Sequence, residues 1–243
     1  MLTGPSPAPS ASGATASSAL QRFLAAGERQ RRRDWGRLRA LGAELQPSIW
    51  SAIGAAGPDP ADWAWGSLLQ LLAEDPQQRL LLDQRWPSGC LTVQSSEADL
   101  AVALQQALVL QQWEEADRVT SALLRRLAGP GAERRGYVYF SEVAPIAPAD
   151  LDAIDHLWWF YSQGRYGFRV QRRLWQQCEQ RWERLWPLLG WKAEGIWTRY
   201  PTAFTWSLEA PEGHLPLVNQ LRGVRVMDAL LRHPGIDGPA LSR

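Results

Sequence analysis

The sequence has few cysteines and no long apolar run. Its 243 residues include two cysteines, Cys90 and Cys178, which is too few for a disulfide framework or for a zinc site made of thiolates. No segment approaches the roughly 18 apolar residues of a membrane-spanning helix, and the N-terminus lacks the basic-then-apolar order of a secretory signal. These absences predict a soluble protein of a reducing compartment.

A strong net charge is also missing. Lysine and arginine total 26 against 25 acidic residues, which leaves a net charge of +1. A balance of this kind gives no global field for nucleic acid or for an anionic membrane. The run of arginines between residues 29 and 33 has no second basic segment beside it. We therefore interpret it as a solvated helix face or a docking point, and we predict no nucleic-acid partner.

Signatures of catalysis are absent from the sequence as well. No glycine-rich phosphate loop of the P-loop or dinucleotide type is present, and no nucleophile–base pair stands out. The histidines His156, His214 and His233 lack the spacing of a metal site. Cys178 is expected to be a buried thiol. The carboxylates of Glu114, Glu115 and Asp117 are expected to lie on a solvated helix face. We expect no enzyme, no catalytic cofactor and no protein-bound metal, and we expect His214 to be a hydrogen-bonded loop residue.

Tryptophan is unusually abundant. There are 14 tryptophans beside only five phenylalanines and five tyrosines, and 45% of the residues are hydrophobic. This apolar content is enough for a buried core. Indole has a wide apolar face and one N–H donor, which suits protein cores, interfaces and aromatic ligands alike.

The composition divides the chain into four parts. Residues 1–18 are almost all small or turn-forming, which predicts a disordered tail. Residues 19–94 show broken helical patterning, which predicts a small N-terminal helical bundle in which Pro47 ends one helix and Asp75–Pro76 begins another. Residues 95–236 form the expected second domain, and residues 237–243 a tail. The Ser-rich N-terminus also weakly resembles a chloroplast transit peptide, so the chloroplast stroma is the lesser alternative for location.

The second domain is expected to be all-α. Ser96 followed by Asp99 approximates a capping box, and the helical pattern breaks at residues 111–112, which predicts two antiparallel helices with Trp113 opening the second. Pro148 begins another helix. Residues 204–208 are the one extended candidate.

Residues 157–175 combine seven aromatic side chains with two glycines. We expect a helix to end near Ser162, a turn that uses Gly164 and Gly167, and a new helix from Phe168. The four consecutive aromatics at 158–161 point all round a helix, so they cannot share one core face. Some of these side chains are therefore expected to lie on a second apolar surface.

A second aromatic region lies between residues 190 and 234. It carries Trp191, Trp197, Tyr200, Phe204 and Trp206 among glycine, proline and polar spacers. Irregular segments of this length are uncommon unless they are functional. Arg222 and Arg225 follow, three positions apart. They suit ligand carboxylates if they lie beside an aromatic concavity, and they are otherwise a solvated face.

Several motifs now stand in series: "WEEADRVTSALL", "DLDAIDHLW", "YSQGRYGFRVQRRLW" and "SLEAPEGHLP". In this order they resemble the genomes-uncoupled-four family, porphyrin-binding regulators of magnesium chelatase in chlorophyll synthesis. The resemblance covers residues 97–233. It implies a cupped, all-helical domain with a long aromatic loop, which binds protoporphyrin IX and Mg-protoporphyrin IX and activates the chelatase.

The resemblance also implies a set of binding residues. Phe168 occupies the apolar binding position of the "GRYGF" motif, Val170 is expected on the same wall, and Trp159 stands where a smaller aliphatic residue is expected. Asn219 matches a contact to porphyrin-bound magnesium, and Arg222 and Arg225 match partners of the propionates. With Trp191, Trp197 and Tyr200 from the aromatic region, these residues make up the expected porphyrin site.

The expected partners and location follow from the same resemblance. They are a porphyrin and magnesium chelatase, through its large porphyrin-binding subunit, with the protein as a monomer. The location is the cyanobacterial cytoplasm, with peripheral contact to the thylakoid membrane. The alternative is a divergent paralogue that acts as a protein-interaction or tetrapyrrole-sensing module without activating the chelatase.

Overall fold

The computed structural model describes residues 11–54, 57–218 and 223–238, with side chains from residue 15 onward. Within these ranges the regular secondary structure is helical apart from one two-stranded hairpin, so the all-α prediction is confirmed. The chain divides into two compact units, residues 1–59 and 60–243.

Four helical elements lie in the part of the first unit that the structure describes. They are α1 (Ala11–Ala25), α2 (Glu28–Arg39), the 3-10 helix η1 (Gly42–Leu45) and α3 (Gln46–Ile53). Residues 11–18, expected to be disordered, lie in α1, because alanine favours helix and Ala16, Leu20 and Phe23 form a buried stripe. Pro47 lies in the first turn of α3, where the missing N–H costs nothing, so it begins a helix instead of ending one.

The second unit begins with α4 (Trp63–Ala73) and α5 (Pro76–Arg85). The side chain of Asp75 accepts hydrogen bonds from the backbone N–H groups of Gln77 and Gln78, which confirms the predicted start of α5. Nearly every residue of α4 is buried, and the helix packs against α9. The compact unit therefore starts at residue 60, whereas the sequence places the domain boundary at 94. Patterning alone assigned these helices to the N-terminal bundle because it does not show which partner buries them.

Two antiparallel helices follow, α6 (Ala98–Val109) and α7 (Trp113–Leu127). The break at 111–112 and the start at Trp113 are as predicted, and Gln111 makes the turn with φ 55°.

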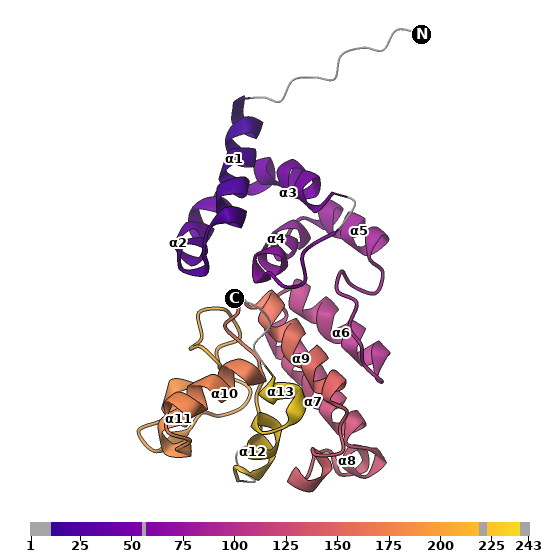
Figure 1. The fold of residues 1–243 in the computed structure, drawn as a ribbon, viewed down its shortest axis with the longest axis vertical. Coiled ribbons are helices and arrows are strands. Elements are labelled where there is room, and N and C mark those ends of the chain that lie inside the picture. Colours follow the sequence, from indigo (N-terminus) through magenta and orange to yellow (C-terminus); the bar gives the residue numbers. More distant parts are fainter. Residues whose placement is uncertain (1–10, 55–56, 219–222, 239–243) are drawn as a thin grey trace. The chain divides into compact units, whose positions relative to one another are not determined.

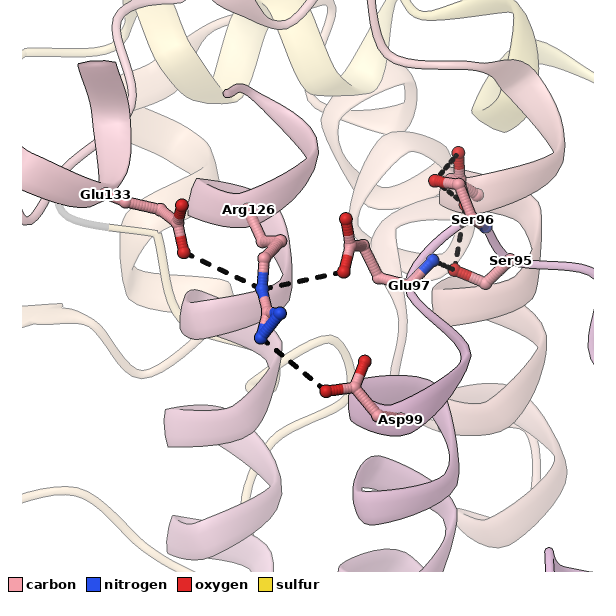
Figure 2. Close-up of polar contacts among 7 residues, drawn as sticks. Ser95, Ser96, Glu97, Asp99, Arg126 and Glu133 are labelled. Atoms are coloured by element: carbon pink, nitrogen blue, oxygen red, sulfur yellow. Dashed lines mark hydrogen bonds and ion pairs between the residues drawn. The ribbon is translucent and has the colours of Figure 1, made fainter. Parts of the chain in front are cut away.

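Ser96 is not the cap of α6, contrary to the prediction. The residue at the cap position is Glu97, which makes no capping side-chain bond. Ser95 and Ser96 instead donate hydrogen bonds to the buried carboxylate of Asp150, at 2.8 Å and 3.1 Å between oxygens. Figure 2 shows this serine pair and, beside it, Arg126 of α7 surrounded by Glu97, Asp99 and Glu133.

The helix α9 (Pro148–Tyr161) is central to the second unit. It follows α8 (Pro130–Arg135) and the 3-10 helix η2 (Phe140–Glu142), and it packs against α4, α6 and α13 (Figure 1). Because neighbours lie on several sides, Trp158, Phe160 and Tyr161 are all buried, and Trp159 is half-buried. Most of the consecutive aromatics thus belong to a core that surrounds the helix, so the expectation of a second apolar surface is wrong for these three side chains.

The rest of the chain carries the candidate site. It comprises α10 (Phe168–Gln177), α11 (Trp182–Leu188), strands β1 (Lys192–Ala193) and β2 (Ile196–Trp197), α12 (Arg225–Leu231) and α13 (Pro234–Asp237). The predicted helix end at Ser162 and start at Phe168 are confirmed. Residues 204–208 are not a strand. The hairpin lies at 192–197, where Glu194 and Gly195 both have positive φ, as a tight hairpin turn requires.

Candidate functional site

The turn between α9 and α10 is bonded to the long connection that follows α11. We call residues 189–218 of this connection the aromatic loop. The N–H of Gly167 donates to the carbonyl oxygen of Leu215 at 3.0 Å, and the N–H of Gly213 donates to that of Arg165 at 2.8 Å. The Tyr166 hydroxyl donates to the carbonyl oxygen of Ser207 at 2.6 Å. Two motifs about forty positions apart in the sequence therefore form one structural element.

Buried side chains hold the far end of the aromatic loop. The amide of Gln171, on α10, donates to the carbonyl oxygens of Gly213 and Pro216 at 2.9 and 2.8 Å. The N–H of Leu217 donates to a carboxylate oxygen of Asp117, on α7, at 2.6 Å. The loop is thus attached to two helices before it reaches the residues outside the described ranges.

His214 occupies the inside of the aromatic loop. Its Nδ1 lies 2.6 Å from the carbonyl oxygen of Leu189, and its Nε2 accepts a hydrogen bond from the N–H of Thr205 at 3.3 Å. Burial lowers the pKa of this imidazole, which agrees with a neutral ring that donates at Nδ1 and accepts at Nε2. The predicted role as a hydrogen-bonded loop residue is confirmed.

Asp117 is buried, whereas the sequence predicts a solvated carboxylate. Burial raises its pKa to about 7, and the hydrogen bond from Leu217 lowers it by less. The prediction fails because Asp117 faces the aromatic loop, a neighbour that helical periodicity cannot reveal. Glu114 is exposed, and Glu115 forms an ion pair with Arg118 at 2.6 Å, so these two carboxylates lie at the surface as expected.

Tryptophan rings form a continuous stack beside the aromatic loop. Ring centroids are 4.8 Å apart between Trp175 and Trp182, 5.2 Å between Trp182 and Trp186, and 5.7 Å between Trp186 and Trp191. Trp197 packs on Trp186 from the hairpin, also at 5.7 Å. The Lys192 ammonium lies 5.1 Å from the Trp197 ring centre. The stack gives the loop a rigid, apolar base.

A second aromatic cluster lies further along the loop. The rings of Tyr200, Phe204 and Trp206 are 6.0 to 6.3 Å apart, and Phe204 also lies 5.5 Å from His214. Tyr200 is 57% exposed, while Phe204 and Trp206 are half-buried. Loop aromatics held in place but left partly exposed are available to a ligand.

The structure brings together only part of the predicted site. Trp191 and Trp197 share Trp186 as a neighbour, and Tyr200 belongs to the adjoining cluster. Phe168 and Val170 are 0% and 5% exposed, so their side chains are buried inside the domain.

The other predicted residues lie elsewhere or are not described. Trp159 is on α9, with its ring 6.2 Å from that of His156. Arg225 opens α12 and places its guanidinium 5.2 Å from the ring centre of Phe140. Asn219 and Arg222 fall outside the described residues.

Sequence reasoning missed several residues that build this region. Trp182 and Trp186 complete the stack, and Gln171 and Asp117 anchor the loop. The helical spacing of Trp182 and Trp186 could have revealed the first pair. The second pair gives no local indication, because each bonds a backbone group at least 42 positions away.

Within the described residues, no three histidine, cysteine, aspartate or glutamate side chains are arranged to hold a metal ion. In the same described residues, no helix is both long enough and apolar enough to cross a membrane.

Comparisons with known proteins place these features in a family. Residues 94–234 match the family model described as GUN4-like. The chain is 46% identical over 173 residues to the Ycf53-like protein of Synechocystis, covering 70% of this chain and 74% of that protein. It is 40% identical over 140 residues to the Arabidopsis thaliana protein named "Tetrapyrrole-binding protein, chloroplastic", covering 54% of this chain and about half, 53%, of that protein.

Two solved structures are similar to the chain. The GUN4 structure from Chlamydomonas reinhardtii matches with a TM-score of 0.57 at 35% identity, over 60% of this chain and 96% of that one. The ligand-free structure of Arabidopsis thaliana GUN4 matches with a TM-score of 0.52 at 41% identity, over 56% of this chain and 96% of that one.

Proposed function

The chain belongs to the GUN4-like family, because residues 94–234 match the model of that family. On this basis we propose that the chain binds a tetrapyrrole at the aromatic loop. The observation that carries the proposal is the way the loop is built. Tyr200, Phe204 and Trp206 are partly exposed, yet hydrogen bonds to α7, α10 and the α9–α10 turn hold the part of the loop that follows them. A preorganised aromatic surface binds a flat apolar ligand without a large ordering cost.

The ligands we propose are protoporphyrin IX and Mg-protoporphyrin IX. Such a disc is apolar over most of its area, and removing apolar surface from water contributes roughly 25 cal/mol per Å². Trp197 and Tyr200 are the proposed wall of the site, with Trp191 behind them. The family resemblance adds Trp159, Phe168 and Val170 to this wall. The propionates would pair with Arg222 and Arg225, and Asn219 would contact the ligand's magnesium.

The proposed role is regulatory and non-catalytic. The protein would activate magnesium chelatase in chlorophyll biosynthesis by acting with its large porphyrin-binding subunit, as a monomer in the cytoplasm or at the thylakoid surface. Its support is the family membership, together with the Arabidopsis relative named as a tetrapyrrole-binding protein.

A porphyrin titration tests the binding proposal. Deuteroporphyrin and its magnesium form are titrated into the full chain, with absorbance and tryptophan quenching as readouts. Trp197→Ala and Tyr200→Ala should each raise Kd about tenfold, because a lost wall ring removes apolar contact of about 1–3 kcal/mol. Arg225→Ala should raise Kd less, since exposed ion pairs contribute about 0–1 kcal/mol.

Trp65→Ala is the matched control, because Trp65 is a half-buried tryptophan on α4, outside the aromatic loop. Its Kd should equal that of the unmodified chain. Absence of saturable binding would overturn the proposal, and so would an equal loss of affinity in the control.

A chelatase assay tests the regulatory part. Adding the porphyrin-loaded chain to the purified chelatase subunits should raise the rate of magnesium insertion, most clearly at low magnesium. Porphyrin binding without any change in that rate would identify the chain as a divergent, tetrapyrrole-sensing paralogue and overturn the regulatory role.

A further inference from the structure

A cavity of about 580 Å³ lies within the second unit, between α4, α5, α6, α7 and the segment that joins α5 to α6. None of its described lining residues belongs to the aromatic loop or to the predicted tetrapyrrole site. Its volume falls in the range of about 300–1,000 Å³ that is typical of small-molecule sites.

The walls of the cavity are mainly apolar. Leu69 comes from α4, Leu82 from α5, and Val109 and Leu110 from the end of α6, while the indole of Trp86 stands just after α5. Trp86, Val109 and Leu110 are half-buried, so apolar side chains remain in contact with the open space. Such walls favour an apolar body over a hydrated one.

The floor of the cavity is a buried polar network. The Tyr161 hydroxyl donates to Oε1 of Gln105 at 3.1 Å and lies 3.2 Å from Sγ of Cys90. The same Gln105 oxygen accepts the N–H of Leu91 at 2.8 Å. Two donors therefore already occupy this oxygen. Because the Tyr161 hydroxyl gives its proton to Gln105, the Cys90 S–H has two acceptors within reach, the Tyr161 hydroxyl oxygen at 3.2 Å and Gln105 Oε1 at 3.6 Å. As a weak donor, the thiol is the group of this network that a ligand's acceptor could recruit at the least cost.

The floor and the rim carry no unbalanced charge among the described residues. Burial raises the pKa of Cys90 to about 11 and raises that of Tyr161, so both groups stay protonated at neutral pH. The charged lining residues are Arg79, Asp83 and Glu115. Arg79 lies 3.9 Å from Asp83, and Glu115 pairs with Arg118. Neither a carboxylate nor an ammonium would find an unopposed partner there.

The backbone around Gly89 is shaped to this floor. Gly89 has φ +90°, and a Cβ at this position would lie 2.3 Å from the side-chain amide of Gln105. Any other residue would displace Gln105 and with it the bonds to Leu91 and Tyr161.

We propose that this cavity binds an uncharged, largely apolar small molecule that carries a hydrogen-bond acceptor, a carbonyl or an ether oxygen, at one end. The apolar body lies against Trp86, Leu82 and Val109, and the acceptor receives the Cys90 S–H. The site differs in chemistry from one for a dicarboxylic tetrapyrrole, and it does not depend on the function proposed above.

Nile red, a neutral apolar dye with a carbonyl group, is the probe for a first test on the full chain. Its fluorescence should rise, shift to shorter wavelength and saturate at one dye per chain. Val109→Trp should weaken binding at least about tenfold, because the indole would fill the space that has to bury the dye.

Val102→Trp is the matched control, because Val102 is a half-buried valine of the same helix that does not line the cavity. It should leave Kd within about twofold. Thermal unfolding of both variants checks that they are folded.

A second readout avoids variants of the cavity walls. In a Cys178→Ser chain, Cys90 is the single thiol, and its alkylation by N-ethylmaleimide at pH 9 is followed by mass spectrometry. Saturating Nile red should slow this alkylation several-fold, whereas deuteroporphyrin should not. The proposal is overturned if no saturable dye binding occurs, if Cys90 is unprotected, or if Trp197→Ala removes dye binding while Val109→Trp does not.

Discussion

At the scale of single residues, the buried carboxylate of Asp117 attaches the end of the aromatic loop to helix α7. Asp117 is 3% exposed, and its carboxylate accepts the N–H of Leu217, two positions before Asn219, the residue expected to contact the porphyrin's magnesium. With a pKa raised to about 7, the carboxyl group changes charge near neutral pH. The attachment of the aromatic loop is therefore sensitive to pH.

Asp117→Asn tests this sensitivity. The folded pKa of about 7 lies above the ordinary value of 3.8, so the stability that the proton provides is fully present at low pH and is lost as pH rises through 7. Asparagine keeps an acceptor for Leu217 but carries no charge. We expect the variant to exceed the unmodified chain in unfolding free energy by about 1–3 kcal/mol at pH 8, with the difference shrinking toward pH 5.

Urea unfolding at both pH values measures this difference. Glu114→Gln, at an exposed neighbour on the same helix, should show a much smaller trend, because the Glu114 charge raises the pKa of Asp117 less than burial does. Equal pH profiles for the Asp117 variant and the unmodified chain would disprove the assignment.

Local sequence features predicted the residues whose partners are close by in the chain. Asp75 caps α5 through groups two and three positions away, and Gly167 makes the turn before α10. Ser96 gives the same kind of local indication, but its hydroxyl bonds Asp150, 54 positions away. The preference of serine for helix caps does not reveal that another group, brought close only by the tertiary structure, competes for its hydroxyl.

At the scale of elements, Arg169 joins three helices. From α10 its guanidinium reaches Asp155 at 2.8 Å and Asp152 at 2.6 Å, both on α9, and the carbonyl oxygen of Gly235 on α13 at 2.8 Å. The side chains of Arg169 and Asp155 are only 12% and 3% exposed. Burial raises the pKa of Asp155, and the guanidinium opposes that shift.

Removing Arg169 should therefore be costly. Arg169→Ala leaves Asp155 buried without its cation, and we expect a loss of about 3–5 kcal/mol in unfolding free energy. Arg173→Ala on the same helix breaks an exposed pair with Glu212 and should cost no more than about 1 kcal/mol. Chemical denaturation compares the two, and similar losses would refute the bridging role of Arg169.

Helix α4 approaches α9 through a glycine. A Cβ on Gly66 would lie 2.1 Å from the carbonyl oxygen of Phe160, whereas one on Gly36 of α2 would meet nothing within 4 Å. Gly66→Ala should thus destabilise the second unit by about 1–3 kcal/mol or more. Gly36→Ala should stabilise the first unit by up to about 1 kcal/mol. Hydrogen exchange resolves the two units, and unchanged protection of α4 and α9 in Gly66→Ala would contradict the close contact.

The elements differ in how well the sequence predicted them. The α9–turn–α10 arrangement follows from its glycines and from Pro148, and it was predicted closely. The hairpin at 192–197 was missed because each strand has only two residues, too few for an alternating pattern. The family resemblance implies that Phe168 and Val170 belong to the apolar binding wall, and the packing around α10 buries both side chains. A motif identifies a binding position but does not show how far the protein's own side chains cover it.

At the scale of the whole molecule, the chain consists of two compact units, and the family match covers only part of the second. Helices α4 and α5 lie between the start of this unit and the start of the match. Gln70 of α4 donates to the carbonyl oxygens of Leu108 and Tyr161 at 2.9 and 2.8 Å. These helices therefore support the matched core from outside it.

Two fragments separate these contributions. Residues 60–243 should unfold cooperatively with nearly the stability of the second unit in the full chain. Residues 95–243 should fold, since the solved Arabidopsis structure corresponds to 56% of this chain, but with about 2–5 kcal/mol less stability because one side of α9 is uncovered. The shorter fragment should keep porphyrin binding and lose Nile red binding. Equal stability of the two fragments by urea unfolding would show that α4 does not support the core.

The hairpin that carries Lys192 has a practical consequence. Lys192 lies against Trp197, and the sequence contains no other lysine. Once the α-amino group is blocked, amine coupling would attach every molecule to a sensor chip through the same point of the aromatic loop. A large partner that recognises this loop would then be sterically shielded, while a small molecule that binds in the cavity lined by α4, α5, α6 and α7 would not. Orientation on the chip would thus report which face of the protein an analyte uses.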